Sequence, residues 1–232
     1  MSKIIVVLGD SLAMSRDEYN IYYKNTYPYL LHEKLYYKFH VINKSKRGNT
    51  TTQQSSTQYL YDEIETINGD IFIIHLGICD CAPRLFNKYE NLFLKINKFN
   101  FLNKIYINFK SKYRRFFTKN FPIVNVKIDQ FRTNLIKLTE TILKTNSNSK
   151  IIFINIAETN KSNKSRSYFF EKNITSYNNV IYEIKEKFSN KIEILDFNYY
   201  TKINSKLLLE DGIHLNNDAH LYIANELFYF LK

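Results

Sequence analysis

The sequence predicts an α/β fold in which a five-stranded parallel sheet is covered by helices on both faces. Short apolar runs bounded by turn residues recur along the 232-residue chain, and segments with helical spacing of apolar residues lie between several of them. Strands that alternate with helices form parallel sheets with both faces covered. A chain of this length suits one domain, so we expect residues 1–232 to form a single domain with an insertion at residues 82–126.

In chain order, the first expected strand is Lys3–Leu8, an apolar run that stops at Gly9. A helix at Tyr27–Tyr37 leads to the strand Phe39–Asn43, and a helix at Gln58–Thr66 leads to the strand Asp70–Leu76, which stops at Gly77. Because reactive groups gather on loops beyond the carboxyl ends of parallel strands, the residues that follow these strands are candidates for a functional site.

After residue 126 the alternation resumes, with a polar stretch that we expect to be a mobile loop. The expected elements are the helix Lys127–Lys144, the strand Lys150–Ile156, the loop Asn160–Lys172, the helix Ser176–Phe188, the strand Lys191–Phe197 and the helix Asp218–Leu231. The last helix is indicated by Ala224, Leu227 and Leu231, which recur at helical spacing.

The insertion at residues 82–126 carries most of the positive charge of the chain. Between Arg84 and Phe121 there are ten basic residues and one acid, Glu90, so this window supplies +9 of the formal charge of +11. Eleven aromatic residues are interleaved with these charges, which indicates a helical insertion or lid. Such a run is most often a solvated amphipathic face, and the alternative is a contact between residues 84–121 and an anionic glycan or a membrane surface.

Several function classes are not expected. Outside the insertion the chain is nearly neutral, and its 26 lysines far outnumber its 7 arginines, so we do not expect nucleic acid as a partner. The chain has no G-x-G-x-x-G or G-x-x-x-x-G-K-[ST] pattern, which argues against dinucleotide or P-loop chemistry. Cys79 and Cys81 are too close for an ordinary disulfide and too few for a zinc cluster. We therefore expect no metal or cofactor, and a cytoplasmic protein or one peripheral to the membrane.

The glycines mark a candidate reaction site. Gly9-Asp10-Ser11-Leu12 places a serine at the tip of the first strand, a position suited to a nucleophile. Gly48 and Gly77 follow the second and third strands, where unhindered backbone N–H groups can stabilise a developing oxyanion. Alternatively, Ser11 merely caps a helix that follows the first strand.

Asp211-Gly212-Ile213-His214 places an acid and an imidazole three residues apart, just before the last helix. One short loop can therefore supply a general base, His214, and the carboxylate that orients it, Asp211. A structural role for His214 is the alternative. Together with Ser11, these residues predict the site of a hydrolase.

These four segments resemble the blocks of the SGNH hydrolases, also called the GDSL esterase and lipase superfamily. Gly9-Asp10-Ser11-Leu12 is similar to the first block, Gly48 to the second, Gly77-x-x-Asp80 to the third and Asp211-x-x-His214 to the last. The resemblance implies a flavodoxin-like three-layer α/β/α sandwich, with Ser11 as nucleophile, His214 as base and Asp211 as its partner. It also implies an oxyanion hole formed by the backbone amides of Ser11 and Gly48 and by an asparagine side chain of the third block.

The chain departs from this pattern at Cys79, which stands where the family has the asparagine. A thiol is a poor hydrogen-bond donor, and loss of one oxyanion donor typically costs about 10²–10³ in rate. Cys79 is thus a weak substitute donor, a wall of the pocket or, least expected, a nucleophile. Asp10 and Asp80 either support the site directly or hydrogen-bond to loop amides as structural acids.

The function expected from these residues is hydrolysis of an ester through an acyl-serine intermediate, with a small acyl group such as acetyl on a carbohydrate as the substrate. The string from Gly77 to Arg84 is similar to the G-I-V-D-C-A-P-R signature of SGNH-like proteins from bacterial surface-polysaccharide gene clusters. One alternative is a carbohydrate O-acyltransferase that uses the same serine. The other is a non-catalytic binding protein for an anionic polymer or a membrane surface. The sequence makes no prediction of the oligomeric state.

Overall fold

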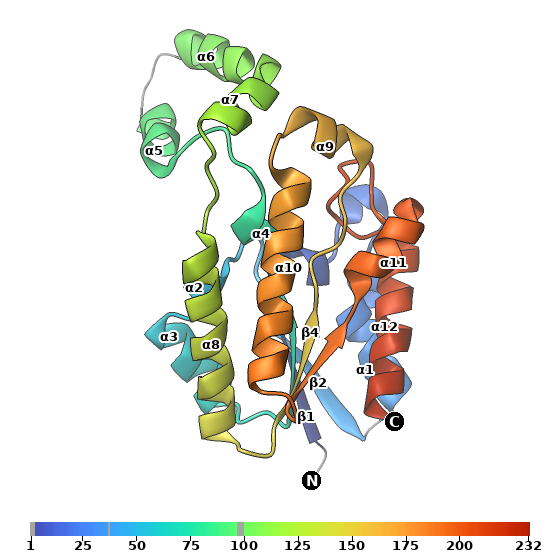
Figure 1. The fold of residues 1–232 in the computed structure, drawn as a ribbon. Helices are drawn as coiled ribbons and strands as arrows, with labels where there is room; N and C mark the ends of the chain where they lie inside the picture. Colours follow the sequence, from blue (N-terminus) through green and yellow to red (C-terminus); the bar gives the residue numbers. More distant parts are fainter. Residues whose placement is uncertain (1–2, 37, 97–99) are drawn as a thin grey trace.

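The computed structural model describes residues 3–36, 38–96 and 100–232. Its centre is a five-stranded sheet with the strand order β2-β1-β3-β4-β5, and every pairing in it is parallel (Figure 1). The strands are β1 (Lys3–Gly9), β2 (Phe39–Asn43), β3 (Ile71–His75), β4 (Lys150–Ile154) and β5 (Ile192–Leu195). This sheet confirms the predicted fold class.

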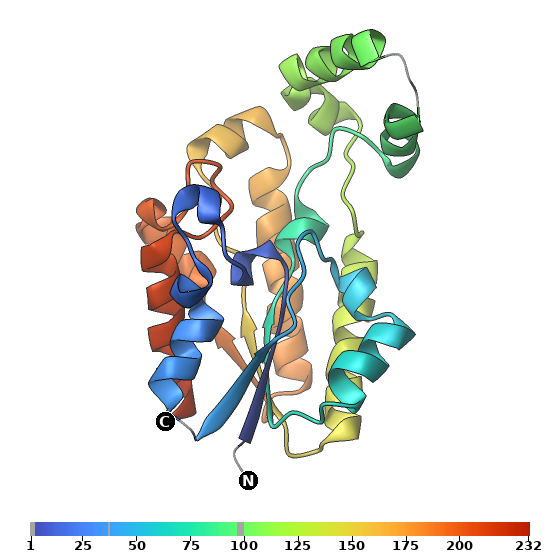
Figure 2. The same ribbon diagram turned by 180° about the vertical axis from the view of Figure 1, so that it is seen from behind.

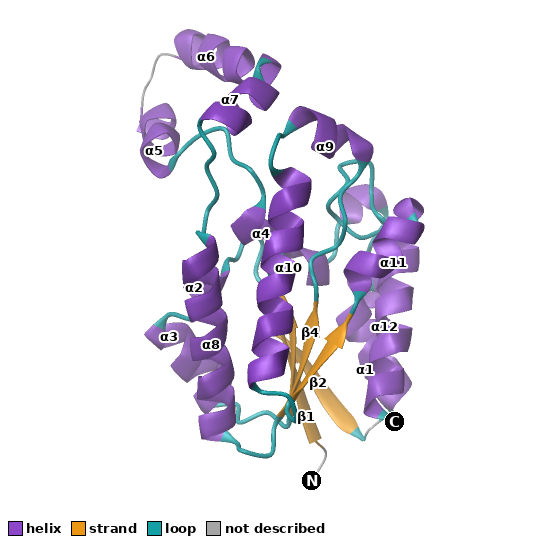
Figure 3. Cartoon of the chain, in the orientation of Figure 1, coloured by secondary structure: helices purple, strands orange, loops and turns teal. Residues whose placement is uncertain are grey.

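Helices cover both faces of the sheet, as Figure 3 shows. On one face α1 (Tyr27–Leu35) packs against α12 (Asn217–Leu231), and on the other α8 (Ile128–Thr145) packs against α10 (Phe170–Lys187). The remaining helices are α2 (Thr51–Gln54), α3 (Thr57–Leu60), α4 (Ile78–Cys81), α5 (Lys88–Ile96), α6 (Asn100–Lys112), α7 (Arg114–Asn120), α9 (Lys161–Arg166) and α11 (Phe197–Ile203). Short 3-10 turns lie at Ser11–Ala13, Asp17–Tyr19, Tyr23–Asn25 and Ser205–Leu207, and a π-helical turn lies at Tyr61–Glu65.

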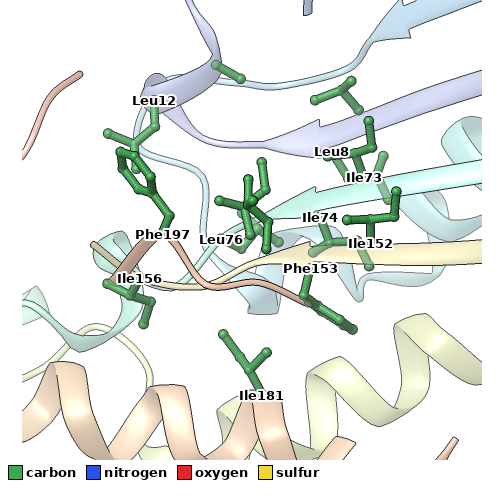
Figure 4. Close-up of a cluster of buried hydrophobic side chains, with 14 of the residues drawn as sticks. Leu8, Leu12, Ile73, Ile74, Leu76, Ile152, Phe153, Ile156, Ile181 and Phe197 are labelled. Atoms are coloured by element: carbon green, nitrogen blue, oxygen red, sulfur yellow. The ribbon is translucent and has the colours of Figure 1, made fainter. Parts of the chain in front are cut away.

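The core lies between the sheet and these two helical layers. Figure 4 shows Leu8, Ile73, Ile74, Ile152 and Phe153 of three neighbouring strands within one buried cluster. Parallel strands that are buried on both faces need continuous apolar runs, which is what β1, β3 and β4 contain. Each fully buried aliphatic side chain contributes roughly 1.5–3 kcal/mol to folding. The core therefore fixes the sheet edge from which the loops of the site extend.

Two expectations for the second half of the chain are wrong. The stretch Asn160–Lys172 is not a loop throughout, because α9 forms within it and α10 already begins at Phe170. The Asn160 side chain starts α9 by accepting a hydrogen bond from the backbone N–H of Asn163. Phe170 and Ile174 are buried, so the apolar face of α10 extends beyond the predicted start at Ser176.

Other boundaries moved by a few residues. The predicted strand Lys191–Phe197 ends at Leu195, because Asp196 caps α11 by accepting a hydrogen bond from the Tyr199 N–H. The predicted helix Gln58–Thr66 consists of α3 and the π-helical turn that continues it. Tyr37, the expected end of the first helix, lies outside the described residues.

Helices α5, α6 and α7 lie beyond the carboxyl ends of the strands, at the end of the molecule opposite both chain termini (Figures 1 and 2). Glu90 of α5 joins α6 through Lys110, whose Nζ lies 2.6 Å from Glu90 Oε1, and through the Tyr106 hydroxyl at 2.7 Å. Lys98 and Phe99, which belong to the basic aromatic run, lie outside the described residues. Among the described residues, no helix combines the length and the apolar character needed to cross a membrane.

Candidate active site

The strand order brings three of the singled-out segments side by side. Ser11 follows β1, which lies between β2 and β3 in the sheet, so the loops that contain Gly48 and Gly77 flank the serine loop. The amide nitrogen of the Gln54 side chain donates to the Gly9 carbonyl at 3.0 Å, which ties the segment after Gly48 to the end of β1. The site therefore lies at the carboxyl edge of the sheet, where parallel α/β folds place their ligands.

Ser11, His214 and Asp211 form one hydrogen-bonded chain. The Oγ of Ser11 lies 3.0 Å from Nε2 of His214, and Nδ1 of the same ring lies 2.5 Å from Oδ2 of Asp211. The first two residues are 203 positions apart in the sequence. The alternative that Ser11 caps a helix does not describe its contact, because Asp10 caps the 3-10 turn by accepting from the Leu12 N–H. The arrangement can move a proton from a serine hydroxyl to an imidazole that a carboxylate orients.

The Asp211 loop is shaped by its own backbone. Oδ1 of Asp211 accepts hydrogen bonds from the N–H groups of Ile213 and His214, both at 2.9 Å. Burial alone would raise the pKa of Asp211, but these two bonds and the bond from the His214 ring outweigh burial and hold that pKa well below its usual range. Asp211 is therefore a carboxylate at neutral pH.

Helix α9 holds the same loop from outside. The Asn163 side chain donates to the Asp211 carbonyl at 2.6 Å, and the Asn160 side chain donates to the Glu210 carbonyl at 3.0 Å. Gly212 has φ +67°, and a Cβ there would lie 2.2 Å from the Asn160 amide carbon. This position needs glycine for its backbone conformation and for the close approach of Asn160. The stretch expected to be a mobile loop thus holds the segment that carries Asp211 and His214.

Arg16 is a site residue that no sequence pattern singles out. Its guanidinium contacts Nε2 of His214, the nitrogen that also faces Ser11. Because arginine carries only donors, this contact requires a lone pair on Nε2 and hence the proton on Nδ1, toward Asp211. That tautomer is the one in which the ring can accept a proton from serine.

The Gly48 backbone faces open space. Gly48 has φ +71°, and a Cβ on it would meet no atom within 4 Å, so the backbone conformation and not packing favours glycine here. In the described part of the chain, the backbone N–H groups of Ser11 and Gly48 donate to no other protein group. Both are thus free to stabilise an oxyanion beside Ser11.

Gly77 meets the opposite constraint. Its φ is +125°, and an added Cβ would lie 2.5 Å from Cδ1 of Ile156. The glycine lets β3 turn sharply into α4, which carries Cys79 and Asp80 beside the serine loop.

The Cys79 thiol is next to the carboxyl group of Asp10. Burial raises the pKa of Asp10 from 3.8 to about 7, although hydrogen bonds from the Leu12 N–H and the Cys79 side chain favour its carboxylate. Burial also raises the pKa of Cys79 far above its usual value, and the negative charge of Asp10 adds to this effect. Cys79 is therefore a neutral thiol, which makes it a poor candidate for a nucleophile.

Asp80 links the second and third segments. Its Oδ1 accepts hydrogen bonds from the backbone N–H of Thr51 at 2.9 Å and from the Thr51 hydroxyl at 2.5 Å. The Asn134 side chain of α8 donates to the same hydroxyl oxygen at 3.1 Å. Burial raises the pKa of Asp80 from 3.8 to about 6 despite the bonds from Thr51. Asp80 thus anchors the start of α2, directly after Gly48.

Two further histidines, His75 and His220, lie apart from this chain of contacts. His75 and His220 are buried, and the Tyr27 ring lies between them, at centroid distances of 5.7 and 6.0 Å. Burial lowers the pKa of His75 to about 3 and that of His220 to about 4, so both rings are neutral core side chains. In the described chain, no group of three His, Cys, Asp or Glu side chains is placed to hold a metal ion.

Comparison with known proteins points to one family. A model of the GDSL-like lipase/acylhydrolase family matches residues 7–221, which include all of the residues of the candidate site. No curated protein sequence matches the chain significantly.

Solved structures share the fold at low sequence identity. The lipase/acylhydrolase from Enterococcus faecalis is 15% identical, with a TM-score of 0.68 over 99% of this chain and 95% of that one. Axe2, an acetylxylan esterase from Geobacillus stearothermophilus, is 16% identical, with a TM-score of 0.62 over 98% of this chain and 93% of that one. The esterase EstA from Pseudoalteromonas sp. is 18% identical, with a TM-score of 0.58 over 98% and 96% of the two chains.

Proposed function

The chain belongs to the GDSL-like lipase/acylhydrolase family, and we propose that it is a serine esterase that removes an acetyl group from a carbohydrate. The observation that supports this proposal most directly is the unbroken set of contacts from Ser11 through His214 to Asp211. The same fold in an acetylxylan esterase supports the substrate class.

In the proposed reaction, Ser11 Oγ attacks the ester carbonyl while Nε2 of His214 takes the hydroxyl proton. The backbone N–H groups of Ser11 and Gly48 stabilise the oxyanion, with Cys79 as a weak third donor or a wall of the pocket. His214 then returns the proton to the sugar oxygen, which leaves as the alcohol. Water, deprotonated by His214, attacks the acyl-serine. His214 returns this proton to Ser11 Oγ as the bond to the acyl carbon breaks and acetate is released. Asp211 holds the neutral imidazole in its Nδ1–H tautomer and stabilises the imidazolium that forms when Nε2 takes a proton.

Transfer to a second sugar is the alternative outcome of the same intermediate. It requires a sugar hydroxyl, in place of water, to attack the acyl group on Ser11. Turnover in the presence of added acceptor sugars, with acetate and acetylated acceptor both quantified, separates hydrolysis from transfer.

The test of the esterase is labelling with a fluorophosphonate probe, together with turnover of p-nitrophenyl acetate. Ser11→Ala should abolish labelling and reduce kcat by about 10³-fold or more, and His214→Ala should do nearly the same, because these residues act as a unit. Ser15→Ala, in the same loop, is the matched control and should label like the wild type. Normal labelling of Ser11→Ala would refute the proposed nucleophile. A wild type that labels no better than Ser11→Ala would favour the non-catalytic binding protein.

Helices α5, α6 and α7 support a second component of the proposal, attachment to an anionic membrane surface. Large apolar side chains are exposed there, including Tyr89 at 81% and Phe101 at 75%, among the basic residues of the segment. Basic helices with exposed aromatic residues bind anionic interfaces. Binding to phosphatidylglycerol vesicles should weaken steeply as salt rises, since screening acts over roughly 8–10 Å. Equal binding to phosphatidylcholine vesicles, or binding to neither kind of vesicle, would contradict membrane attachment. Binding to acidic glycans alone would identify these helices as a glycan-binding surface instead.

A further inference from the structure

A pocket of about 570 Å³ opens beside the candidate oxyanion donor. Gly48 lines it on the side of the sheet, and Arg84 and Arg114 line it on the side of the insertion. A group bound in this pocket would therefore lie next to the acyl group that Gly48 stabilises.

Main-chain carbonyls hold both guanidinium groups in place. Nη2 of Arg84 donates to the Cys79 carbonyl at 3.2 Å, and Nη2 of Arg114 donates to the Pro83 carbonyl at 2.8 Å. Nε of Arg114 also donates to the Ser167 hydroxyl at 2.6 Å. These contacts use only some of the five donors on each arginine. The Nε of Arg84 is buried and has no hydrogen-bond partner within the described part of the chain.

In the described part of the chain, no carboxylate lies within ion-pair distance of Arg84, Arg114 or the neighbouring Arg166. Burial lowers the pKa of Arg114, and repulsion from Arg166 and Arg84 lowers it further. The charge of Asp80 acts on Arg84 from beyond ion-pair distance. Oδ1 of Asp80 accepts a hydrogen bond from the Thr51 hydroxyl, and its Oδ2 has no hydrogen-bond partner among the described residues.

The proximity of these arginines is unfavourable for folding when no anion is bound between them. Half-buried guanidinium groups that repel one another destabilise the fold unless an anion compensates them. The arginine fork matches carboxylate and phosphate oxygens with two parallel hydrogen bonds. Six of the seven arginines of this lysine-rich chain lie in the loops and helices at the carboxyl edge, and only Arg132 lies on α8.

We propose that Arg84 and Arg114 form a subsite for an anionic group, a carboxylate or a phosphate ester, on the sugar that carries the acyl group. The inference rests on the proposed esterase function and narrows its substrate class to acylated acidic sugars. The anion is held in the pocket, and the ester lies between Gly48 and Ser11. Neutral acylated sugars would leave both guanidinium groups without a bound anion and would be poorer substrates.

The test uses three O-acetylated methyl glucosides that differ only at C6, which carries a hydroxyl, a carboxylate or a phosphate. We expect kcat/KM of the wild type to be about 10- to 100-fold higher for one or both acidic sugars than for the neutral one, the range typical of a hydrogen bond to a charged group. The preferred acid identifies the anion. Arg84→Gln should remove most of this preference, and Arg114→Gln should do the same where thermal melting shows that it folds. Arg132→Gln, which removes an arginine from α8, is the matched control and should keep the preference.

A binding measurement separates failure of the subsite from failure of the esterase. The Ser11→Ala protein is titrated with methyl glucuronoside, methyl glucoside 6-phosphate and methyl glucoside. This measurement of binding does not depend on turnover. Tighter binding of an acidic sugar, lost when Arg84→Gln is added, supports the subsite even if no ester is turned over. Equal binding of the three sugars, or a preference that survives Arg84→Gln, would overturn the subsite whatever the esterase assay gives.

Discussion

Replacing Asp10 by Asn should stabilise the protein relative to the wild type as the pH rises. The Asp10 side chain is completely buried, and it forms no ion pair with any described residue. Asn keeps the acceptor oxygen for the Leu12 N–H, which lies 2.9 Å from Oδ1 in the wild type. The substitution therefore removes the ability to ionise while it preserves the cap of the 3-10 turn.

The magnitude follows from the pKa of Asp10, which burial raises from 3.8 to about 7 in the folded protein. Because the folded value is the higher one, Asp10 contributes stability that is complete below the unfolded pKa and is lost as the pH rises through the folded pKa. A difference of roughly 3 pH units corresponds to about 4 kcal/mol at 1.36 kcal/mol per unit. Asn loses nothing over this range, so the free energy of unfolding of the variant should gain up to about 4 kcal/mol on that of the wild type between pH 4 and 8.

The assay is urea unfolding followed by circular dichroism at several pH values, with the difference in unfolding free energy plotted against pH. Asp218→Asn, which makes the same change from carboxylate to amide at an exposed position in the first turn of α12, is the matched control. A constant penalty from burying the new amide is expected and leaves the slope unchanged. For Asp10→Asn, a difference in unfolding free energy that stays flat or falls as the pH rises would refute the argument that ionised Asp10 destabilises the folded protein.

Three further predictions concern neighbouring residues. Thr51→Val removes the hydroxyl that donates to Asp80 at 2.5 Å. It should lower the free energy of unfolding by about 1.5–3 kcal/mol at pH 8 and by less at pH 4.5, where Asp80 is protonated. An equal loss at both pH values in urea unfolding would contradict this. Gly77→Ala should cost about 2–5 kcal/mol in the same assay, because backbone strain adds to the clash with its neighbour, whereas Gly48→Ala, which meets open space, should cost about 1–2 kcal/mol. Cys79→Asn should raise kcat/KM on p-nitrophenyl acetate by up to about tenfold, because an amide is a better oxyanion donor than a thiol. Cys79→Ala should leave kcat/KM nearly unchanged. A Cys79→Ala protein that folds but is inactive would make Cys79 a catalytic group.

The sequence by itself determined the sheet and the residues of the hydrogen-bonded chain. Apolar runs that end at Gly9 and Gly77 mark the ends of strands. A buried strand requires apolar residues and the turn that follows it favours glycine, and both requirements fall on residues that are adjacent in the chain. The Asp-x-x-His spacing likewise predicts the contact between Asp211 and His214, since a three-residue turn is a local structure. The α/β class, the five strands and the family were therefore accessible before any tertiary structure.

The long-range packing decided what no local pattern encodes. Helix α9 lacks apolar spacing and was expected to be a loop, yet its asparagines bind carbonyls about fifty residues further along the chain. The contact between Arg16 and His214 spans 198 positions, and its existence depends on how the first and last loops meet.

The pairing of Cys79 with Asp10 and the convergence of Arg84 and Arg114 on one pocket belong to the same class of information. The sequence showed a basic segment, but the strand order and the path of the insertion determined that two of its arginines lie beside Gly48. The physical reason is that charge and hydrogen bonding act over ångströms in space, whereas a sequence pattern records only neighbours along the chain.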